Sequence, residues 1–277
     1  MTRRLPAPDR AVLAAGLALA LGFAVIPLVW GISTALKESG AAESFPPRWL
    51  PWPPTTENFR QVLTGSNLAR YLLNSTVVAL LTIGATLAVA VHAGYAAARF
   101  RFVGKQQILF LILATAMIPG ICILVPVYLL VTQARLHNTY LALVVVYTAW
   151  QAPTAVWIMR GFFEAIDRDL EEAALIDGCS RLSAFYRIIL PLTQPGLAAV
   201  GILVFVYVWN DFLIAYVLTV SDDMRLIQSG LYLYVTAFGV EWSKLMAASV
   251  LALLPPTLTF VALQSRFIQG LTKGAIK

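Results

Sequence analysis

Long stretches without a charged residue alternate with short polar segments along this chain. The first stretch runs from Ala11 to Leu36 and the second from Tyr71 to Ala98. Each could cross a hydrocarbon layer of about 30 Å as a helix that rises about 1.5 Å per residue. The pattern therefore predicts helices that span a membrane.

Four further apolar stretches follow the first two. They cover about Ile108–Thr132, Tyr140–Met159, Gly196–Val220 and Leu245–Leu263. The first of these four contains Pro119 and Pro126, which membrane helices tolerate because neighbouring groups take up the freed carbonyls. We therefore expect an all-α integral membrane protein with about six transmembrane helices.

The remaining segments give the expected organisation of the chain. Residues 1–10 precede a first span at 11–36, which is too long for the apolar core of a cleaved signal peptide. Residues 37–70 are polar and contain five prolines, which predicts an extended extracytoplasmic loop. A core of spans two to six covers 71–264 and includes a charged loop at 160–195, and 265–277 form a tail.

The composition supports a membrane protein and sets its orientation. Hydrophobic residues make up 59% of the chain and charged residues 12%, against about 25% charged residues in a soluble domain. The net charge of +6 comes from basic residues scattered between apolar blocks, a pattern that sets topology and does not indicate nucleic-acid binding. With both termini inside, 13 of the 20 Lys and Arg residues fall on inner segments. The positive-inside rule therefore places both termini in the cytoplasm.

The few cysteines and histidines indicate no metal or catalytic site. Cys122 and Cys179 lie in unlike surroundings and His92 and His137 are far apart in sequence, so no disulfide framework or metal-ligand spacing results. His92 within the second span could relay protons, but we favour a packed histidine that hydrogen-bonds a neighbouring group. No second titratable group accompanies it in that span.

The only strongly charged region is the loop between the fourth and fifth spans. Asp167 and Asp169 begin a helix-favouring run, where negative charge suits the N-terminal end of the helix dipole. Gly178 follows as an expected C-terminal cap, because glycine adopts the left-handed conformation without a Cβ clash. A second short helix should begin near Ser180, and prolines should break it before the fifth span. These are Pro191 and Pro195. The loop is therefore a compact helix–turn–helix, which is more than a connector needs.

The loop carries Glu172-Ala173-Ala174, Asp177-Gly178, Phe185, Ile188, Leu190-Pro191 and Pro195. At this spacing these residues resemble the EAA motif of permease subunits in bacterial ABC importers. Two positions depart from the usual pattern: Cys179 replaces a common alanine and Asp167 a common proline. Further segments are similar to maltose-type carbohydrate permeases, namely Asn74-Ser75, Arg160-Gly161-Phe162-Phe163, Trp209-Asn210-Asp211-Phe212 and the ending Gly270–Lys277.

The resemblance implies a set of partners. These are a second, homologous permease subunit, two ABC ATPase subunits on the inner face of a bacterial cytoplasmic membrane, and an extracytoplasmic solute-binding protein. The chain lacks the G-x-x-x-x-G-K-[ST] phosphate loop, so we expect no cofactor on it, with ATP and Mg²⁺ bound by the ATPase subunits. The chain itself is then a transport subunit and not an enzyme.

Our hypothesis is that the helix from Arg168 to Asp177 sits in a cleft on the ATPase and transmits its closure. Small alanines allow close approach, the acids offer anionic contacts, and the glycine permits the turn. The alternative is that Glu172 and Asp177 are solvated loop charges. The predicted docking residues are Glu171, Glu172, Ala173, Ala174, Asp177, Gly178, Phe185 and Pro191.

Asp211 is the one clear acid inside a predicted span, and it follows Trp209 and Asn210. An ionisable group in a span faces a cavity or a partner, because exposure to lipid costs several kcal/mol. A tryptophan face can stack on a sugar ring, so the three residues could line a sugar path or its gate. Equally, Asp211 could bond a neighbouring helix and Trp209 could be packing.

The solute cannot be identified from these residues. Maltose-type permeases serve disaccharides, oligosaccharides and glycerol-phosphate compounds, and the scarcity of cations in the spans favours a neutral sugar. An ion-coupled secondary transporter is the rival class, but it would need no helical docking loop and would show internal repeats or more intramembrane charge. A purely structural membrane protein is the other alternative.

Overall fold

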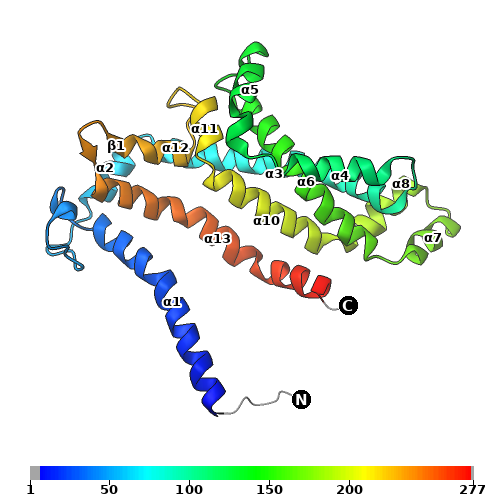
Figure 1. The fold of residues 1–277 in the computed structure, drawn as a ribbon, viewed down its shortest axis with the longest axis horizontal. Helices are drawn as coiled ribbons and strands as arrows, with labels where there is room; N and C mark the ends of the chain where they lie inside the picture. The colour runs from blue at the N-terminus through cyan, green and yellow to red at the C-terminus, as the bar shows by residue number, and fades with distance from the viewer. Residues whose placement is uncertain (1–6, 276–277) are drawn as a thin grey trace. The chain divides into compact units, whose positions relative to one another are not determined.

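The computed structural model describes the backbone of residues 7–275 and the side chains of Asp9 and of residues 12–262. The described part is helical apart from its loops and one small hairpin, β1 (Val235–Thr236) paired with β2 (Gly239–Val240) (Figure 1). This confirms the predicted all-α class. The side chains of the resembling tail, Gly270–Lys277, lie outside the described residues.

The chain divides into two compact units, one made of residues up to 69 with 231–254, and one of 70–230 with residues from 255 on. The first unit holds α1 (Ala7–Ala35), η1 (Ala41–Glu43), α2 (Glu57–Thr64), η3 (Tyr232–Tyr234) and the hairpin. The predicted extended loop at 37–70 therefore contains a helix. Its Asn58 is buried and donates to the carbonyls of Ala35 (2.8 Å) and Lys37 (2.7 Å), which fixes α2 against the end of α1.

The second unit is built around long helices that lie side by side. α6 (Tyr140–Glu164) contacts α4 (Lys105–Thr115) and α10 (Gln194–Asn210). α3 (Leu68–Arg99) runs unbroken, with a stripe of small side chains buried along it. These are Ala79, Thr82, Thr86 and Ala90. Small residues let neighbouring membrane helices approach closely.

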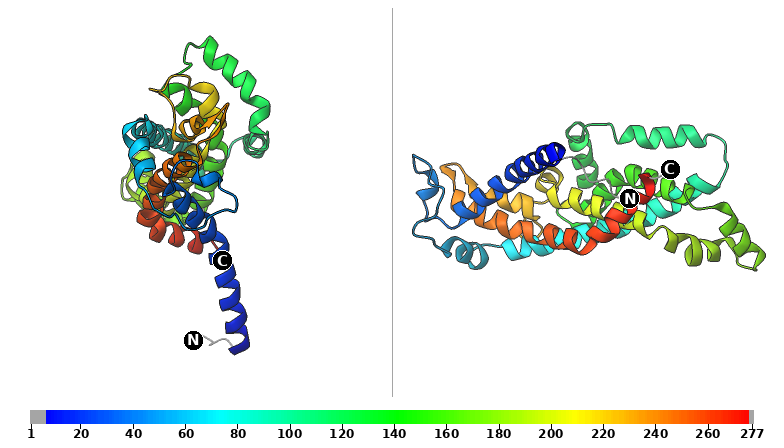
Figure 2. Two further views of the ribbon diagram at one scale, coloured as in Figure 1. Left: turned by 90° about the vertical axis from the view of Figure 1, so that its left-hand side faces the viewer. Right: turned by 90° about the horizontal axis from the view of Figure 1, so that it is seen from below.

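The remaining helices of this unit are short. They are α5 (Gly120–Gln133), α7 (Arg168–Ile176), α8 (Arg181–Ala184), the π-helix η2 (Phe185–Ile189), α9 (Leu190–Leu192), α11 (Leu213–Leu218) and α12 (Ile227–Leu231). α7 and α8 lie at one end of the unit in Figure 1 and in the right-hand view of Figure 2. The last helix, α13 (Trp242–Ala275), begins in the first unit and ends in the second.

Four described helices are long and apolar enough to cross a membrane, and the count rises to six if two bent pairs each form one span. The four windows are Val12–Ala35, Leu68–Arg99, Tyr140–Glu164 and Trp242–Ala262. The predicted number of about six spans agrees with this count.

The third predicted span, Ile108–Thr132, is not one helix. α4 ends at Thr115, α5 begins at Gly120, and the two are bent by 94°. Pro119 stands immediately before α5 with φ −59° and ψ 130°, outside the helical region. A proline removes a backbone donor and disfavours the helical conformation of the residue before it. Pro126, by contrast, lies within α5 without ending it.

The fifth predicted span, Gly196–Val220, is also interrupted. α10 ends at Asn210, Asp211 is extended, and α11 starts at Leu213. The sixth predicted span is longer than expected, because its helix begins at Trp242 and continues past Leu263. In both cases the apolar pattern locates the segment, but the pattern does not determine where the helix ends.

Candidate functional site

Local signals in the sequence explain both ends of α7. Asp167 is the N-cap, and its Oδ1 accepts from the Asp169 amide at 3.2 Å. At the other end Gly178 has φ +85°, the Gly178 amide donates to the Leu175 carbonyl (3.1 Å) and the Cys179 amide to the Ala174 carbonyl (3.0 Å). This pair of bonds is a Schellman motif, which satisfies the last carbonyls of a helix. The predicted helix and its glycine cap are confirmed.

The second half of the loop differs from the single short helix that was predicted. Ser180 caps α8, with its Oγ accepting from the Ser183 amide at 3.2 Å. The helix then widens into the π-helix η2 and continues as α9, which contains Pro191. The break falls at Thr193, where Arg181–Leu192 and Gln194–Asn210 are bent by 71°. π-Helical turns occur frequently at functional sites.

The predicted docking residues separate into two sets. One set is exposed: Glu172, Ala173, Asp177, Gly178 and Pro191. Beside it, Leu170 is 48% and Ile176 86% exposed. The other set faces inward, with Ala174 and Phe185 buried and Glu171 largely covered. Only the first set could contact a partner directly without rearrangement of the loop.

Glu171 is held by two residues from the end of α3. Its Oε2 lies 3.1 Å from Arg99 Nε in an ion pair whose side chains are 6% (Arg99) and 13% (Glu171) exposed. Tyr95 donates its hydroxyl hydrogen to Glu171 Oε1, and Arg99 Nη2 donates to the Ile166 carbonyl at 2.9 Å. Glu171 therefore joins α7 to α3 and does not face outward as a docking residue.

Phe185 occupies an aromatic cluster behind the loop. Its ring lies 4.4 Å from that of Tyr95, 6.0 Å from Phe163 and 5.9 Å from His92 between centroids. His92 Nε2 is 2.7 Å from the Tyr186 hydroxyl, and its Nδ1 is 2.6 Å from the Ala88 carbonyl. The expected hydrogen bond to a neighbour is therefore present, although His92 is exposed and not packed inside.

The sequence interpretation missed Tyr95 and Arg99 as members of this site. Tyr95 lies within the second predicted span and Arg99 directly after it, and the sequence pattern assigns neither residue a role in the loop. The sequence does place an arginine at the last turn of a long apolar helix, where a charge must find water or a partner. That signal identifies Arg99 as a candidate, but it does not name Glu171, which lies 72 positions later.

The second candidate group, Trp209 to Asp211, lies where α10 ends. Asp211 Oδ2 accepts from the Tyr147 hydroxyl (2.8 Å) and from the amides of Ile214 (3.0 Å) and Ala215 (3.1 Å). Trp209 is 2% exposed and stacks on Phe205 at 5.3 Å.

Asn210 is the exposed member of this group, and its Nδ2 donates to the Val206 carbonyl at 2.8 Å. The contacts expected of the packing interpretation are thus present for Asp211 and Trp209. A role of the three in a sugar path stays a prediction. Among the residues that the structure describes, no group of three or more His, Cys, Asp or Glu could hold a metal ion.

Comparison with known proteins places this geometry in a wider context. The chain is 36% identical over 253 residues to the sulfoquinovosyl glycerol transport system permease protein SmoH of Agrobacterium fabrum, covering 91% of this chain and 89% of the relative. It is 32% identical over 271 residues to the trehalose/maltose transport system permease protein MalG of Thermococcus litoralis, covering 97% of each chain. The diacetylchitobiose uptake system permease protein DasC of Streptomyces coelicolor is 32% identical over 253 residues, with 91% and 92% covered.

Solved structures agree on the fold. A chain in the crystal structure of a bacterial ABC transporter that imports the acidic polysaccharide alginate superposes with a TM-score of 0.83 at 21% identity, covering 96% of this chain and all of that one. The profile of binding-protein-dependent transport system inner membrane components matches residues 90–273, which include α7 and the whole charged loop. This multi-pass membrane protein belongs to the family of inner membrane components of binding-protein-dependent transport systems.

Proposed function

We propose that the chain forms half of the translocation path of an ABC importer for a disaccharide or oligosaccharide. The names of its relatives include permeases for trehalose and maltose, for diacetylchitobiose and for sulfoquinovosyl glycerol. The other half of the path is a second, homologous permease subunit. Two ATPase subunits drive transport, and a solute-binding protein delivers the sugar at the opposite face.

The observation that carries this proposal is the exposed face of α7. Leu170, Ala173 and Ile176 are exposed on a helix that lies outside the candidate spans and, with 9 residues, is too short to be one. Burying one such aliphatic side chain in an interface is worth about 1.5–3 kcal/mol. The carboxylates of Glu172 and Asp177 flank this face and offer contacts to cationic groups on the ATPase. This combination of a short capped helix, an apolar face and flanking acids fits a cleft on a partner protein.

Orientation follows from the charge pattern. We place both termini and the α7 loop in the cytoplasm and α2 and the hairpin at the extracytoplasmic face, since the inner segments then carry most of the Lys and Arg residues. The chain lacks a phosphate loop, so ATP and Mg²⁺ are bound by the ATPase subunits and not by this chain.

The proposed solute is a neutral sugar. The basic residues of the two candidate spans Leu68–Arg99 and Tyr140–Glu164 stand near their ends, at Arg70, Arg99 and Arg160, which leaves the middle without a cation for a phosphorylated or acidic solute. A glycerol-phosphate-type compound is the alternative solute class. Thermal shifts of the associated binding protein with maltose, trehalose, chitobiose and glycerol-phosphate esters distinguish these, because a bound solute raises the melting temperature by mass action.

Substitution on the exposed face of α7 tests the docking. Ala173→Arg should expel the ATPase subunits when the importer is purified through a tag on this chain, because a long charged side chain replaces a methyl group at the contact. Ala165→Arg is the matched control, since Ala165 is also exposed in this segment but precedes α7. Full retention of the ATPase and of sugar uptake in the Ala173→Arg variant would count against the proposal.

A further inference from the structure

One helix of the second unit contacts both the α7 loop and a loop at the opposite end of the unit. The first contact is the buried ion pair between Arg99 and Glu171, supported by Tyr95. Arg99 also donates to the carbonyl of Ile166, in the linker between α6 and α7. Thus α3 contacts both the docking helix and the linker that leads to it, although more than 60 residues separate Arg99 from these two segments in the chain.

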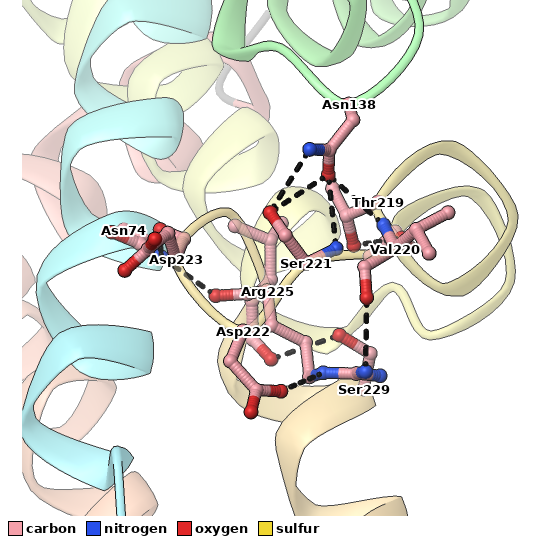
Figure 3. A network of polar contacts seen from close by, with 11 residues as sticks. Asn74, Asn138, Thr219, Val220, Ser221, Asp222, Asp223, Arg225 and Ser229 are labelled. Atoms are coloured by element: carbon pink, nitrogen blue, oxygen red, sulfur yellow. Dashed lines mark hydrogen bonds and ion pairs between the residues drawn. The ribbon is translucent and has the colours of Figure 1, made fainter.

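The other end of α3 contacts the segment that runs from the end of α11 to the first residue of α12, here called the 219–227 loop. Asn74 is buried and uses both amide hydrogens on it, donating to the carbonyls of Asp223 (2.8 Å) and Arg225 (2.9 Å) (Figure 3). Its Oδ1 accepts from the Tyr140 hydroxyl at 2.6 Å. Together these three hydrogen bonds fix the orientation of the Asn74 side chain. Ser75, also buried, accepts from the Ile227 amide at 2.8 Å.

The 219–227 loop is itself braced, so a displacement of one part would move the whole. Asn138 Oδ1 accepts from the amides of Val220 (3.0 Å) and Ser221 (3.2 Å), as Figure 3 shows. Arg225 pairs with Asp222 at 3.1 Å and donates to the Val220 carbonyl at 3.2 Å. These bonds hold the loop together and join it to Asn138, which lies between α5 and α6.

α3 is continuous between these two sets of contacts. From Asn74 to Arg99 it extends about 38 Å at about 1.5 Å per residue, which matches the thickness of a bilayer core with part of its interfaces. Near the Arg99 end, α3 packs directly on the backbone of α6, because a Cβ at Gly94 would lie 3.0 Å from the Arg160 amide nitrogen. α10, by contrast, is bent by 71° at its start and ends at Asn210. A straight helix transmits displacement better than one interrupted at both ends.

We propose that α3 carries movement of the α7 loop to the 219–227 loop, with Arg99 and Glu171 as positioning residues at one end and Asn74 at the other. The inference rests on the proposed docking of an ATPase on α7. When the ATPase closes, it displaces α7. The Arg99–Glu171 ion pair makes α3 move with α7, and the hydrogen bonds of Asn74 make the 219–227 loop move with α3. α6 is joined to α7 by the linker at 165–167, so loss of the ion pair leaves this covalent connection in place but removes the charged contact between α7 and α3.

The test measures the far loop while the ATPase is trapped. The importer is purified through a tag on this chain and placed in nanodiscs, with Cys122 and Cys179 replaced by alanine and Asp223→Cys introduced. Asp223 is suitable because its side chain is 77% exposed and Asn74 contacts only its carbonyl. The substitution removes an exposed ion pair with Arg70 (3.4 Å) and leaves the contact with Asn74 in place. The maleimide reaction rate of the introduced thiol is compared with and without Mg-ATP plus vanadate.

In the parent, trapping should change the rate by about fivefold or more, the lower range of coupling between distant sites. Glu171→Gln should abolish most of that change while the ATPase still co-purifies and hydrolyses ATP. Glu164→Gln is the matched control, because Glu164 also pairs with an arginine (Arg160, 2.7 Å) but within α6. The control should respond as the parent does.

Each other outcome decides the matter. An unchanged response in Glu171→Gln overturns the proposal, and so does a parent that binds the ATPase but shows no response. If Glu171→Gln fails to assemble, Asn74→Ala decides, since Asn74 lies far from α7: a lost response supports the role of α3 and a retained one refutes it. A variant with both Glu171→Gln and Asn74→Ala should lose no more of the response than either single variant, because both contacts lie on the same path through α3. A parent that never binds an ATPase contradicts the proposed function instead.

Discussion

The α7 loop and the Trp209–Asp211 segment both carry polar and aromatic residues that point to function, yet the structure treats them in opposite ways. In the loop, helix caps satisfy the backbone locally, and Ile176 remains 86% and Leu170 48% exposed. At the end of α10, Asp211 accepts three hydrogen bonds and Trp209 is 2% exposed. The loop keeps these apolar side chains exposed, whereas the segment at the end of α10 places most of its side chains in contacts within the chain.

This difference separates residues that serve a partner from residues that serve the fold. An apolar side chain exposed outside the membrane gains nothing until a second protein covers it. A carboxylate that accepts from a tyrosine and two amides is already satisfied, and disturbing it has a cost before any solute arrives. The loop should therefore respond to substitution through assembly, and the α10 end through stability.

The largest expected effect belongs to Asp211→Ala. The substitution leaves the buried Tyr147 hydroxyl without its acceptor and removes the side-chain cap from the start of α11. Together these changes should destabilise the protein by about 2–4 kcal/mol. Thermal unfolding of the purified importer in detergent measures this. A variant that unfolds like the parent but transports nothing would show instead that Asp211 acts on the solute.

Substitution of Glu171 and of Glu172 should separate an effect on stability from an effect on assembly within the loop. Glu171→Ala leaves Arg99 without its counter-ion, and a cost of about 2 kcal/mol is expected for a pair that is mostly covered. Glu172→Ala removes an exposed carboxylate and should change the stability by less than about 0.5 kcal/mol. Only Glu172→Ala should weaken ATPase binding at unchanged thermal stability. Equal losses of stability in both variants would contradict the inward and outward division.

A change at the end of α7 tests the loop as a rigid unit. Gly178→Val introduces a β-branched residue at φ +85°, where an L-residue is strained by about 1–2 kcal/mol, although its Cβ would meet no atom within 4 Å. We expect the protein to fold and to hydrolyse ATP, with less sugar imported per ATP. Gly161→Val is the control, because its Cβ also meets nothing and its backbone is helical. Normal coupling in Gly178→Val would show that the cap geometry is dispensable.

The sequence predicted those parts of the fold that depend on nearby residues. The ends of α7 follow from Asp167 and Gly178, which act on amides and carbonyls within a few positions. The number of spans follows from long apolar stretches. The 94° bend near Pro119 was missed because Pro126 has the same local chemistry and does not end its helix. Tertiary packing decides which proline breaks a span.

The functional residues were predictable only as far as their partners are local. The loop motif located the docking helix, but it could not show that Glu171 faces Arg99 while Glu172 faces outward. The two glutamates are adjacent in sequence and chemically identical, and the residue that distinguishes them is on α3. The sequence marks Asp211 as costly in a span, but the groups that donate hydrogen bonds to its carboxylate could not be told from solute hydroxyl groups without the position of Tyr147.

The smallest expected effect on stability comes from Asn210→Ala, which nevertheless decides what the α10 end contributes to transport. Asn210 is exposed, and its side chain donates to the Val206 carbonyl one turn earlier, so its removal should cost less than about 0.5 kcal/mol. If Asn210 lines the sugar path, uptake should show a raised KM with unchanged ATP hydrolysis, because the amide contacts solute and not the fold. Gln194→Ala, an exposed amide at the other end of the same helix, should leave KM unchanged. Equal uptake by both variants would limit the role of this segment to packing, and the solute contacts would then belong to other residues or to the second permease subunit.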